Sequence, residues 1–324
     1  MKSLIFRIQL KLGSYFFNLF NIRLLTKKPE KGLADELRAN YNNLPVFKGL
    51  EPEDTDKSNP LDTWQGNLNL LREKVLSTNI HSFLKWDIIK KTMNNGNNAD
   101  FIYAELLSLK KHKEWSFYKN GLKENWVGER SMYPFYPSAS PTLLHTAYHL
   151  AEFESNTSSK TIDYDCILEF GGGFGSMCRL NFNLGFNSGY IIFDFVHFSL
   201  LQKYYLKSNN IPVVTIDEFI RTKKGVVCIS DTDELNAILD IYDSKSRILL
   251  IATWSISESP IDVRDLFLKS CDNVDSFLFA YQNNFENVDN NKYFDSYQKN
   301  HENISWSGNK ITHLPSDNYL FGKR

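Results

Sequence analysis

The alternation of short apolar runs with helical stretches after residue 155 constrains the fold of this chain most strongly. Each run is long enough for one buried strand, and each intervening stretch is long enough for a helix that crosses back over a sheet. Runs that are apolar throughout are typical of parallel strands covered on both faces. We therefore predict an α/β fold with strands at 166–170, 190–195, 226–230, 248–253 and 274–281, and a final pair within 304–320. Segment 211–216 competes with 226–230 for the third strand.

The strongest local motif is Glu169-Phe-Gly-Gly-Gly-Phe-Gly175, between the first expected strand and a helical stretch. Backbone N–H groups are free at such a turn, and glycines let a ligand approach the main chain closely. A dinucleotide would place its pyrophosphate beside the carboxylate of Glu169, and Ser176 stands where that fingerprint takes Gly or Ala. S-adenosyl-L-methionine instead carries a sulfonium and an ammonium group, so the motif favours this cofactor. The predicted contacts are Glu169, Phe170, Gly171, Gly172, Gly173 and Gly175.

Acidic residues also end the next two apolar runs. Asp194 lies about twenty residues beyond the glycines, where a carboxylate can accept hydrogen bonds from ribose hydroxyls. Asp231, in Asp231-Thr-Asp233, is predicted to lie at the edge of the cofactor or to cap a helix. An Asp-x-Asp after a strand is also compatible with a divalent metal and a sugar nucleotide, as in a glycosyltransferase.

The acceptor side of the site is expected on the loops that follow the fourth and fifth strands. Ligands collect beyond the carboxyl ends of parallel strands, where Trp254, Ser257 and Glu258 follow one run and Tyr281 ends the next. Glu258 is a candidate general base, although a cap on the helix near residue 261 would explain it equally well. We therefore name Glu258 and Tyr281 as candidate catalytic residues.

Histidines supply the other candidate bases. His301 and His313 lie near the C-terminus, and imidazole titrates near neutral pH. His145 and His149 stand one helical turn apart, the separation that a two-histidine metal site would use. No glutamate follows His145, so the metalloprotease pattern is absent and surface or core histidines are the commoner explanation. We name no metal ligand, and the sequence leaves open whether a divalent metal assists the reaction.

Four segments resemble the sugar O-methyltransferases that are found among bacterial surface-polysaccharide genes. They are 169–175, 252–260, Asp289-Asn290 with Tyr293-Phe294, and 318–324. The Trp-Ser-x-Ser-Glu and Asp-Asn-x-x-Tyr-Phe segments are the most particular to this family, and the resemblance covers roughly residues 130–324. It implies a class I, Rossmann-like, seven-stranded methyltransferase sheet, S-adenosylmethionine as donor, and a hydroxyl of a glycan or sugar nucleotide as acceptor, in O-antigen or capsule biosynthesis.

The predicted organisation has three parts: an amphipathic helix and linker at 1–60, a helical cap at 61–154, and the cofactor-binding domain at 155–324. Residues 1–25 place apolar side chains on one helical face and polar or basic ones on the other. Such a helix commonly packs on its own fold or on a second subunit, which leaves a homo-oligomer open. It is also compatible with contact at an anionic membrane surface.

Composition excludes some partners. The 37 basic and 38 acidic residues nearly balance, which is unlike a protein that neutralises many phosphates along a nucleic acid. The four cysteines are widely spaced without a Cys-x-x-Cys pair, and no run has the length of a membrane span. We expect a cytoplasmic enzyme, with peripheral contact at the inner membrane open. The rival interpretations are a glycosyltransferase using Asp231 and Asp233, a methyltransferase of a non-sugar molecule, and a scaffold without a cofactor.

Overall fold

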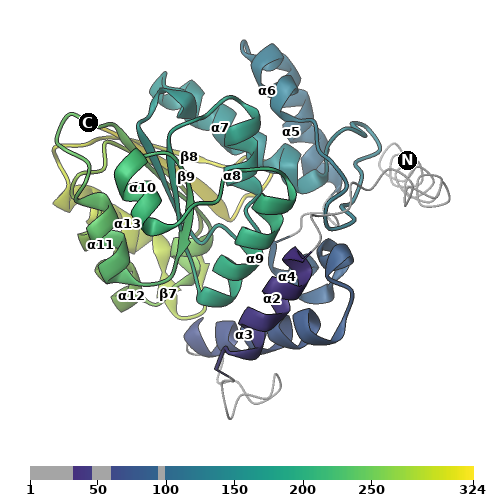
Figure 1. Ribbon diagram of the computed structural model, residues 1–324. Helices are drawn as coiled ribbons and strands as arrows, with labels where there is room; N and C mark the ends of the chain where they lie inside the picture. The colour runs from purple at the N-terminus through teal and green to yellow at the C-terminus, as the bar shows by residue number, and fades with distance from the viewer. Residues whose placement is uncertain (1–31, 46–59, 94–98) are drawn as a thin grey trace.

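The computed structural model describes residues 32–45, 60–93 and 99–324 (Figure 1). The amphipathic helix expected at 1–25 lies outside these residues. Among the residues described, no helix is long and apolar enough to cross a membrane.

Seven strands form one sheet in the order β3-β2-β1-β4-β5-β9-β8. The first five strands run parallel, whereas β9 is antiparallel to both β5 and β8. The Rossmann-like, seven-stranded sheet predicted from the sequence is confirmed. The strands are β1 (Cys166–Phe170), β2 (Gly189–Phe193), β3 (Gly225–Ile229), β4 (Ile248–Thr253), β5 (Ser276–Gln282), β8 (Ser305–Lys310) and β9 (Asp317–Lys323).

The third strand is β3, and the competing segment 211–216 is not a strand. It contributes one isolated bridge between Val213 and Val226, and Thr215 then caps the next helix by accepting a hydrogen bond from the backbone N–H of Glu218. A short pair, β6 (Asn284–Phe285) and β7 (Val288–Asp289), forms a separate hairpin after β5.

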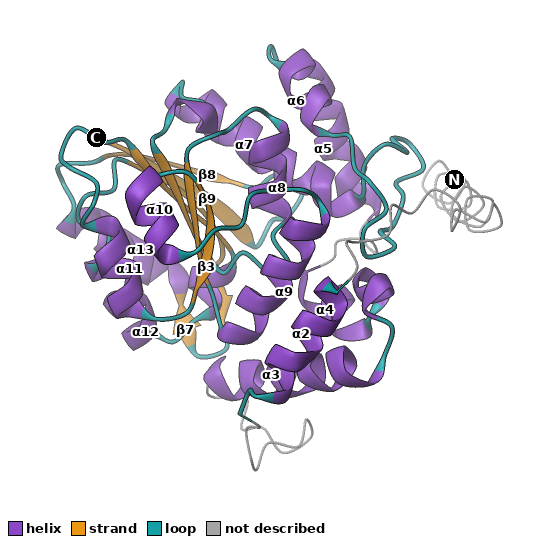
Figure 2. Ribbon diagram, viewed as in Figure 1, coloured by secondary structure: helices purple, strands orange, loops and turns teal. Residues whose placement is uncertain are grey.

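Helices cover both faces of the sheet, as Figure 2 shows. Alternate strand residues divide between two apolar cores: Ile167 and Leu249 belong to one, and Leu168 and Leu250 belong to the other. The first core is covered by α7 (Pro141–Thr157), α8 (Ser176–Asn183) and α9 (Val196–Ser208). The second is covered by α10 (Ile216–Thr222), α11 (Thr232–Leu239), α12 (Ile261–Lys269) and α13 (Asn290–Asn300).

The helical N-terminal extension that the sequence predicted packs on the first of these cores. Tyr41, Phe83 and Leu106 are buried in the same cluster as Ile167 of β1, so the apolar core is continuous across residue 155. The extension also brings α4 and α5 to the carboxyl ends of the strands. Its helices are α2 (Leu33–Asn42), α3 (Pro60–Ser77), α4 (Asp87–Met93), α5 (Ala99–Lys111) and α6 (Trp115–Gly121), with a 3-10 helix, η2, at Ile80–Lys85.

Candidate active site

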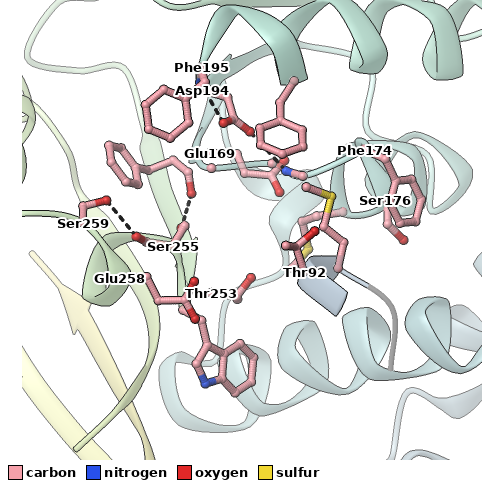
Figure 3. A pocket seen from close by; sticks show the side chains of 18 of the residues that line it. Thr92, Glu169, Phe174, Ser176, Asp194, Phe195, Thr253, Ser255, Glu258 and Ser259 are labelled. Atoms are coloured by element: carbon pink, nitrogen blue, oxygen red, sulfur yellow. Dashed lines mark hydrogen bonds between the residues drawn. The ribbon is translucent and has the colours of Figure 1, made fainter. Parts of the chain in front are cut away.

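A cavity of about 1050 Å³ opens at the carboxyl ends of the parallel strands. The strands β2 and β3 lie on one side of β1, and the strands that follow them in the chain, β4 and β5, lie on the other side of β1. This reversal is the topological switch point, where open α/β sheets bind their ligands. The loops after β1, β2, β3 and β4 line the cavity, together with residues from α4, α7 and α12. Figure 3 shows side chains from the loops after β1, β2 and β4 and from α4.

The glycine turn packs directly against the loop that follows β4. Gly171 has a φ angle of +70°, and a Cβ atom placed there would lie 2.3 Å from the Cβ of Ser255. The hydroxyl of Ser255 donates to the carbonyl of Phe170, which fastens the two loops together. The predicted contact residues from Glu169 to Gly173 line the cavity. Gly175 does not; it is the N-cap of α8, with a φ angle of +96°.

Glu169 is a buried acid on the cavity wall. Its side chain accepts a hydrogen bond from the hydroxyl of Tyr190 at 2.7 Å. Burial raises the pKa of Glu169 to about 8, and the charge of nearby Asp194 adds to this effect, while the Tyr190 hydrogen bond opposes it. Burial therefore favours the neutral form of Glu169, and a cationic ligand would favour the carboxylate.

Asp194 joins the glycine turn to α9. Its Oδ1 accepts from the backbone N–H of Phe195 at 2.8 Å, and its Oδ2 accepts from Gln202 at 2.8 Å and from the N–H of Gly173 at 3.2 Å. Burial raises the pKa of Asp194 to about 7. A carboxylate has about four acceptor positions, so one remains on Oδ1 for a ligand hydroxyl. The predicted ribose contact is compatible with this geometry.

Asp231 requires a correction. It is exposed and caps α11, where its Oδ1 accepts from the N–H groups of Asp233 at 2.9 Å and Glu234 at 3.1 Å. Ser230 and Thr232 line the cavity at this strand end, whereas Asp231 does not. No group of three or more His, Cys, Asp or Glu side chains in the described part of the chain could hold a metal ion. The metal-dependent use of Asp231 and Asp233 therefore has no structural support.

Glu258 faces the cavity at the end of a 3-10 helix, η5 (Ser255–Glu258). Burial raises its pKa to about 7; Gln282 lowers this value through a hydrogen bond, and the charge of Asp317 raises it. The helix that follows, α12, has Pro260 at its N-cap and no side-chain cap. The capping explanation of Glu258 is therefore wrong, and the side chain belongs to the cavity.

Two buried side chains, Arg264 and Asn290, hold the η5 loop in place, and we call this pair the clamp. Arg264 is fully buried and donates to the carbonyls of Ser259 at 2.7 Å and Ser257 at 2.6 Å, and to Oδ1 of Asn290 at 2.7 Å. The amide of Asn290 donates to the carbonyls of Ser257 at 3.3 Å and Gln282 at 3.0 Å. The Asp289-Asn290 motif thus positions the active-site loop and does not itself line the cavity.

Three of the proposed catalytic residues do not reach the cavity. Tyr281 points to the opposite face of β5 and packs on Phe294, with ring centroids 4.2 Å apart. His301 ends α13, where its Nδ1 lies 2.8 Å from the carbonyl of Tyr297. The structure therefore places Tyr281 and His301 away from this cavity, and it gives no support to their predicted catalytic roles. His313 does not line the cavity either, but its imidazole contacts a buried carboxylate, that of Glu105.

Glu105 of α5 joins two histidines, and it was not among the residues predicted from the sequence. Its Oε1 lies 2.8 Å from Nε2 of His313 and 2.7 Å from Nδ1 of His145. His145 and His149 are both buried and both line the cavity, beside the indole of Trp254. The spacing of the two histidines was visible in the sequence, but the acidic partner of His145, forty residues earlier, was not.

No protein-family model and no curated protein sequence matches the chain. Solved structures similar to it include the methyltransferase domain of bacterial CtHen1, with 12% identity, 53% of this chain and 97% of that chain covered, and a TM-score of 0.36. The magnesium protoporphyrin IX methyltransferase ChlM from Synechocystis PCC 6803 has 10% identity, coverage of 56% and 83%, and a TM-score of 0.35. The plantazolicin methyltransferase BpumL has 9% identity, coverage of 76% and 93%, and a TM-score of 0.35. Scores of this size carry no argument about function, and the fold assignment rests on the strand order.

Proposed function

We propose that this chain is an S-adenosylmethionine-dependent O-methyltransferase. The observation that carries the proposal is the charge of the switch-point cavity. Its described lining contains four carboxyl groups, Glu169, Asp194, Glu258 and Asp317, and no arginine. Its lysines, Lys90 and Lys91, are exposed on α4. A ligand with a sulfonium and an ammonium group would favour the ionised forms of these carboxyl groups, whereas a pyrophosphate at the glycine turn would have no buried arginine or lysine of the described lining to pair with.

The residues present suit this cofactor in shape as well as in charge. The glycine turn lines the cavity with residues that have little or no side chain, and Asp194 keeps an acceptor position for a ribose hydroxyl. Partly exposed apolar surface for an adenine ring is offered by Phe195, Val196 and Leu266. When bound, the cofactor would supply the methyl group. The cavity volume of about 1050 Å³ is at the upper end of the roughly 300–1,000 Å³ range of ligand pockets, which is compatible with an acceptor beside the cofactor.

For the acceptor we propose a sugar hydroxyl, on a glycan or a sugar nucleotide of bacterial surface polysaccharide such as O-antigen or capsule. This part rests on the sequence resemblance. A neutral hydroxyl is a weak nucleophile, so the acceptor side needs a base and a water-poor environment. A non-sugar hydroxyl would meet the same chemical requirements and is an outcome of the acceptor assay described below.

Equilibrium binding tests the cofactor. We expect S-adenosylmethionine and S-adenosylhomocysteine to bind in isothermal titration calorimetry and to raise the melting temperature with the logarithm of ligand excess. NAD should not bind, and no UDP-sugar should bind in a way that depends on manganese. Binding of a UDP-sugar that depends on manganese would instead support the glycosyltransferase interpretation.

The affinity for S-adenosylmethionine should increase with pH. Burial raises the pKa of Glu169 to about 8 and those of Asp194 and Glu258 to about 7. These groups are largely protonated below those values, and a cation favours their ionised forms, so binding should release protons and tighten from about pH 6 to about pH 8. Calorimetry in two buffers of different ionisation enthalpy measures the released protons. An affinity that stays constant or falls over this range would contradict the proposed charge interaction.

Asp194 and Asp231 form a matched pair of acidic residues at neighbouring strand ends. Asp194→Ala should weaken S-adenosylmethionine binding by about 1.5–3 kcal/mol, the range for hydrogen bonds to a charged group. Asp231→Ala removes a helix cap and should cost about 1 kcal/mol of folding stability without changing the affinity. Calorimetry and urea unfolding measure the two quantities. Parental affinity in Asp194→Ala would rule out the ribose contact.

A further inference from the structure

The N-terminal half of α7 presents two imidazoles to the cavity, and a buried carboxylate stands behind one of them. His145 and His149 line the cavity, and Glu105 of α5 is fully buried beside them. Oε1 of Glu105 lies 2.7 Å from Nδ1 of His145 and 2.8 Å from Nε2 of His313. The carboxylate of Glu105 therefore lies between the two imidazoles, and His145 is the one that lines the cavity.

The carboxylate fixes which nitrogen of His145 faces the cavity as a base. Burial opposes the ionisation of Glu105, but the charges of His145 and His313 and their hydrogen bonds lower the pKa of its carboxyl below the usual range. An ionised carboxylate only accepts hydrogen bonds, so Nδ1 of His145 must carry a proton and donate it. In the neutral ring Nε2 then keeps its lone pair. No described residue forms a hydrogen bond with Nε2.

Aromatic neighbours hold the His145 ring in place. The indole of Trp254 stacks on it with centroids 5.3 Å apart and an interplanar angle of 29°, and Phe101 meets it edge-on at 5.4 Å. Trp254 and Phe101 also line the cavity. The ring is therefore oriented by packing on both sides as well as by the hydrogen bond to Glu105.

His149 differs from His145 in its surroundings. Its Nδ1 bonds to the hydroxyl of Tyr319, and its Nε2 is buried without a hydrogen-bond partner among the described residues. Burial, followed by the charges of His145 and His313, lowers its pKa well below the usual value. His149 thus stays neutral, and of these two imidazoles only His145 has a carboxylate to balance a positive charge.

We propose that His145 is the general base of the methyl transfer and that Glu105 is its positioning residue; the proposal rests on the proposed function. Nε2 of His145 takes the proton of the acceptor hydroxyl while the hydroxyl oxygen forms its bond to the methyl carbon. The carbon–sulfur bond breaks, and its electron pair stays on sulfur. The positive charge that arrives on His145 is then paired with Glu105.

This assignment moves the proton transfer away from Glu258, the base that the sequence favoured. A sulfonium in the cavity attracts the negative form of Glu258 and lowers its pKa, which makes this carboxylate a weaker base. His145 instead has the carboxylate of Glu105 within hydrogen-bond distance, which can pair with the positive charge that the ring gains with the proton. A nucleophile, a base and an orienting carboxylate in this order form the usual arrangement for activating a hydroxyl.

The tautomer of His145 tests the proposal without any acceptor. Long-range ¹H–¹⁵N correlation spectra of protein labelled at its histidines show which ring nitrogen carries the proton, and His145→Asn assigns the signal. We expect a proton on Nδ1 and a bare Nε2 at neutral and mildly alkaline pH, both with and without S-adenosylhomocysteine. Glu105→Gln should give a mixture of tautomers. A wild-type His145 with a proton on Nε2 throughout this range overturns the proposal.

Turnover supplies the second test. Asparagine at position 145 can still donate an N–H to Glu105 but offers no base to the cavity. With radiolabelled S-adenosylmethionine and a panel of methyl glycosides and nucleotide sugars, His145→Asn should lower kcat by about a hundredfold or more with unchanged cofactor affinity. Added imidazole should partly restore His145→Ala. The matched control His301→Asn should behave like the parent.

The outcomes separate the two proposals. Parental turnover in His145→Asn, with turnover lost in Glu258→Gln, overturns the assignment of the base. A parent protein that fails to bind S-adenosylmethionine contradicts the proposed function. A parent that binds it but methylates no member of the panel contradicts the sugar acceptor, and the tautomer measurement then decides the state of His145.

Discussion

Gly171→Ala is expected to abolish detectable S-adenosylmethionine binding, whereas Gly185→Ala should bind like the parent. Both glycines have positive φ angles, +70° and +99°, so both alanine variants carry a similar backbone strain. That strain is about 1–2 kcal/mol per residue. Only at Gly171 does the new Cβ collide with a neighbour, at 2.3 Å from the Cβ of Ser255; at Gly185 nothing lies within 4 Å. The difference between the variants therefore isolates the contact between the glycine turn and the η5 loop.

The collision cannot be relieved by a rotamer change, because both atoms are attached directly to the backbone. The glycine turn or the η5 loop must move, and the hydrogen bond from Ser255 to the carbonyl of Phe170 is lost. Overpacking costs about 1–3 kcal/mol, in addition to the backbone strain. Calorimetry measures the affinity and urea unfolding the stability. The double variant Gly171→Ala/Ser255→Gly removes the second Cβ and should recover part of the affinity. Parental binding by Gly171→Ala would place the cofactor elsewhere.

The structure also changes which glycine of the motif is most sensitive. From the sequence alone, Gly173→Val is the natural variant for blocking the cofactor, because a branched side chain there would fill the space that the ligand needs. In the structure a Cβ at Gly173 would lie 3.2 Å from the sulfur of Met93, which ends a flexible side chain and can move aside. The sensitive position depends on Ser255, a partner more than eighty residues away.

Local patterns predicted the strands and the ligand turn correctly. The runs at 166–170 and 248–253 are strands with the expected bounds, because apolar residues bounded by turn formers specify a buried parallel strand within a few residues. The position of Glu169 relative to the glycines likewise follows from the motif alone. Each of these predictions depends on interactions within a short stretch of chain.

For a strand that is buried on both faces, the sequence could not predict which side chains lie on the cavity side. β5 is buried along almost its whole length, so its alternation of side chains carries no contrast between polar and apolar residues. Tyr281 and Gln282 are therefore equally good candidates for the cavity side. In the structure Gln282 accepts a hydrogen bond from Ser257 beside the cavity, while Tyr281 packs in the opposite core.

The histidine partners depended on contacts between distant segments. His313 and His145 meet at Glu105, which is 208 residues from the first and 40 from the second. Glu105 lies in a helical stretch where an acidic residue ordinarily faces solvent, and nothing local marks it as buried. The tertiary packing of α5 against α7 creates this site, and no motif in the sequence identifies it.

Asn290→Ala is expected to destabilise the protein by about 3 kcal/mol or more, the upper range for leaving a charged buried donor without its partner. Asn290 is fully buried, and its Oδ1 accepts from the guanidinium of Arg264 at 2.7 Å. Its amide also satisfies the carbonyls of Ser257 and Gln282. Alanine removes the acceptor and both donors at once, and the buried Arg264 has no solvent to replace them. Urea unfolding followed by circular dichroism measures the free energy of unfolding.

The neighbouring residue provides the control, because Asn291 has the same side chain but is exposed. Asn291→Ala should change the free energy of unfolding by no more than about 0.5 kcal/mol. A functional prediction follows as well. Arg264 and Asn290 hold the loop that contains Ser257 and Glu258, so the folded fraction of Asn290→Ala should bind S-adenosylmethionine more weakly than the parent. If Asn290→Ala unfolds at the same urea concentration as Asn291→Ala, the clamp does not stabilise the loop, and the Asp289-Asn290 motif must act through another contact.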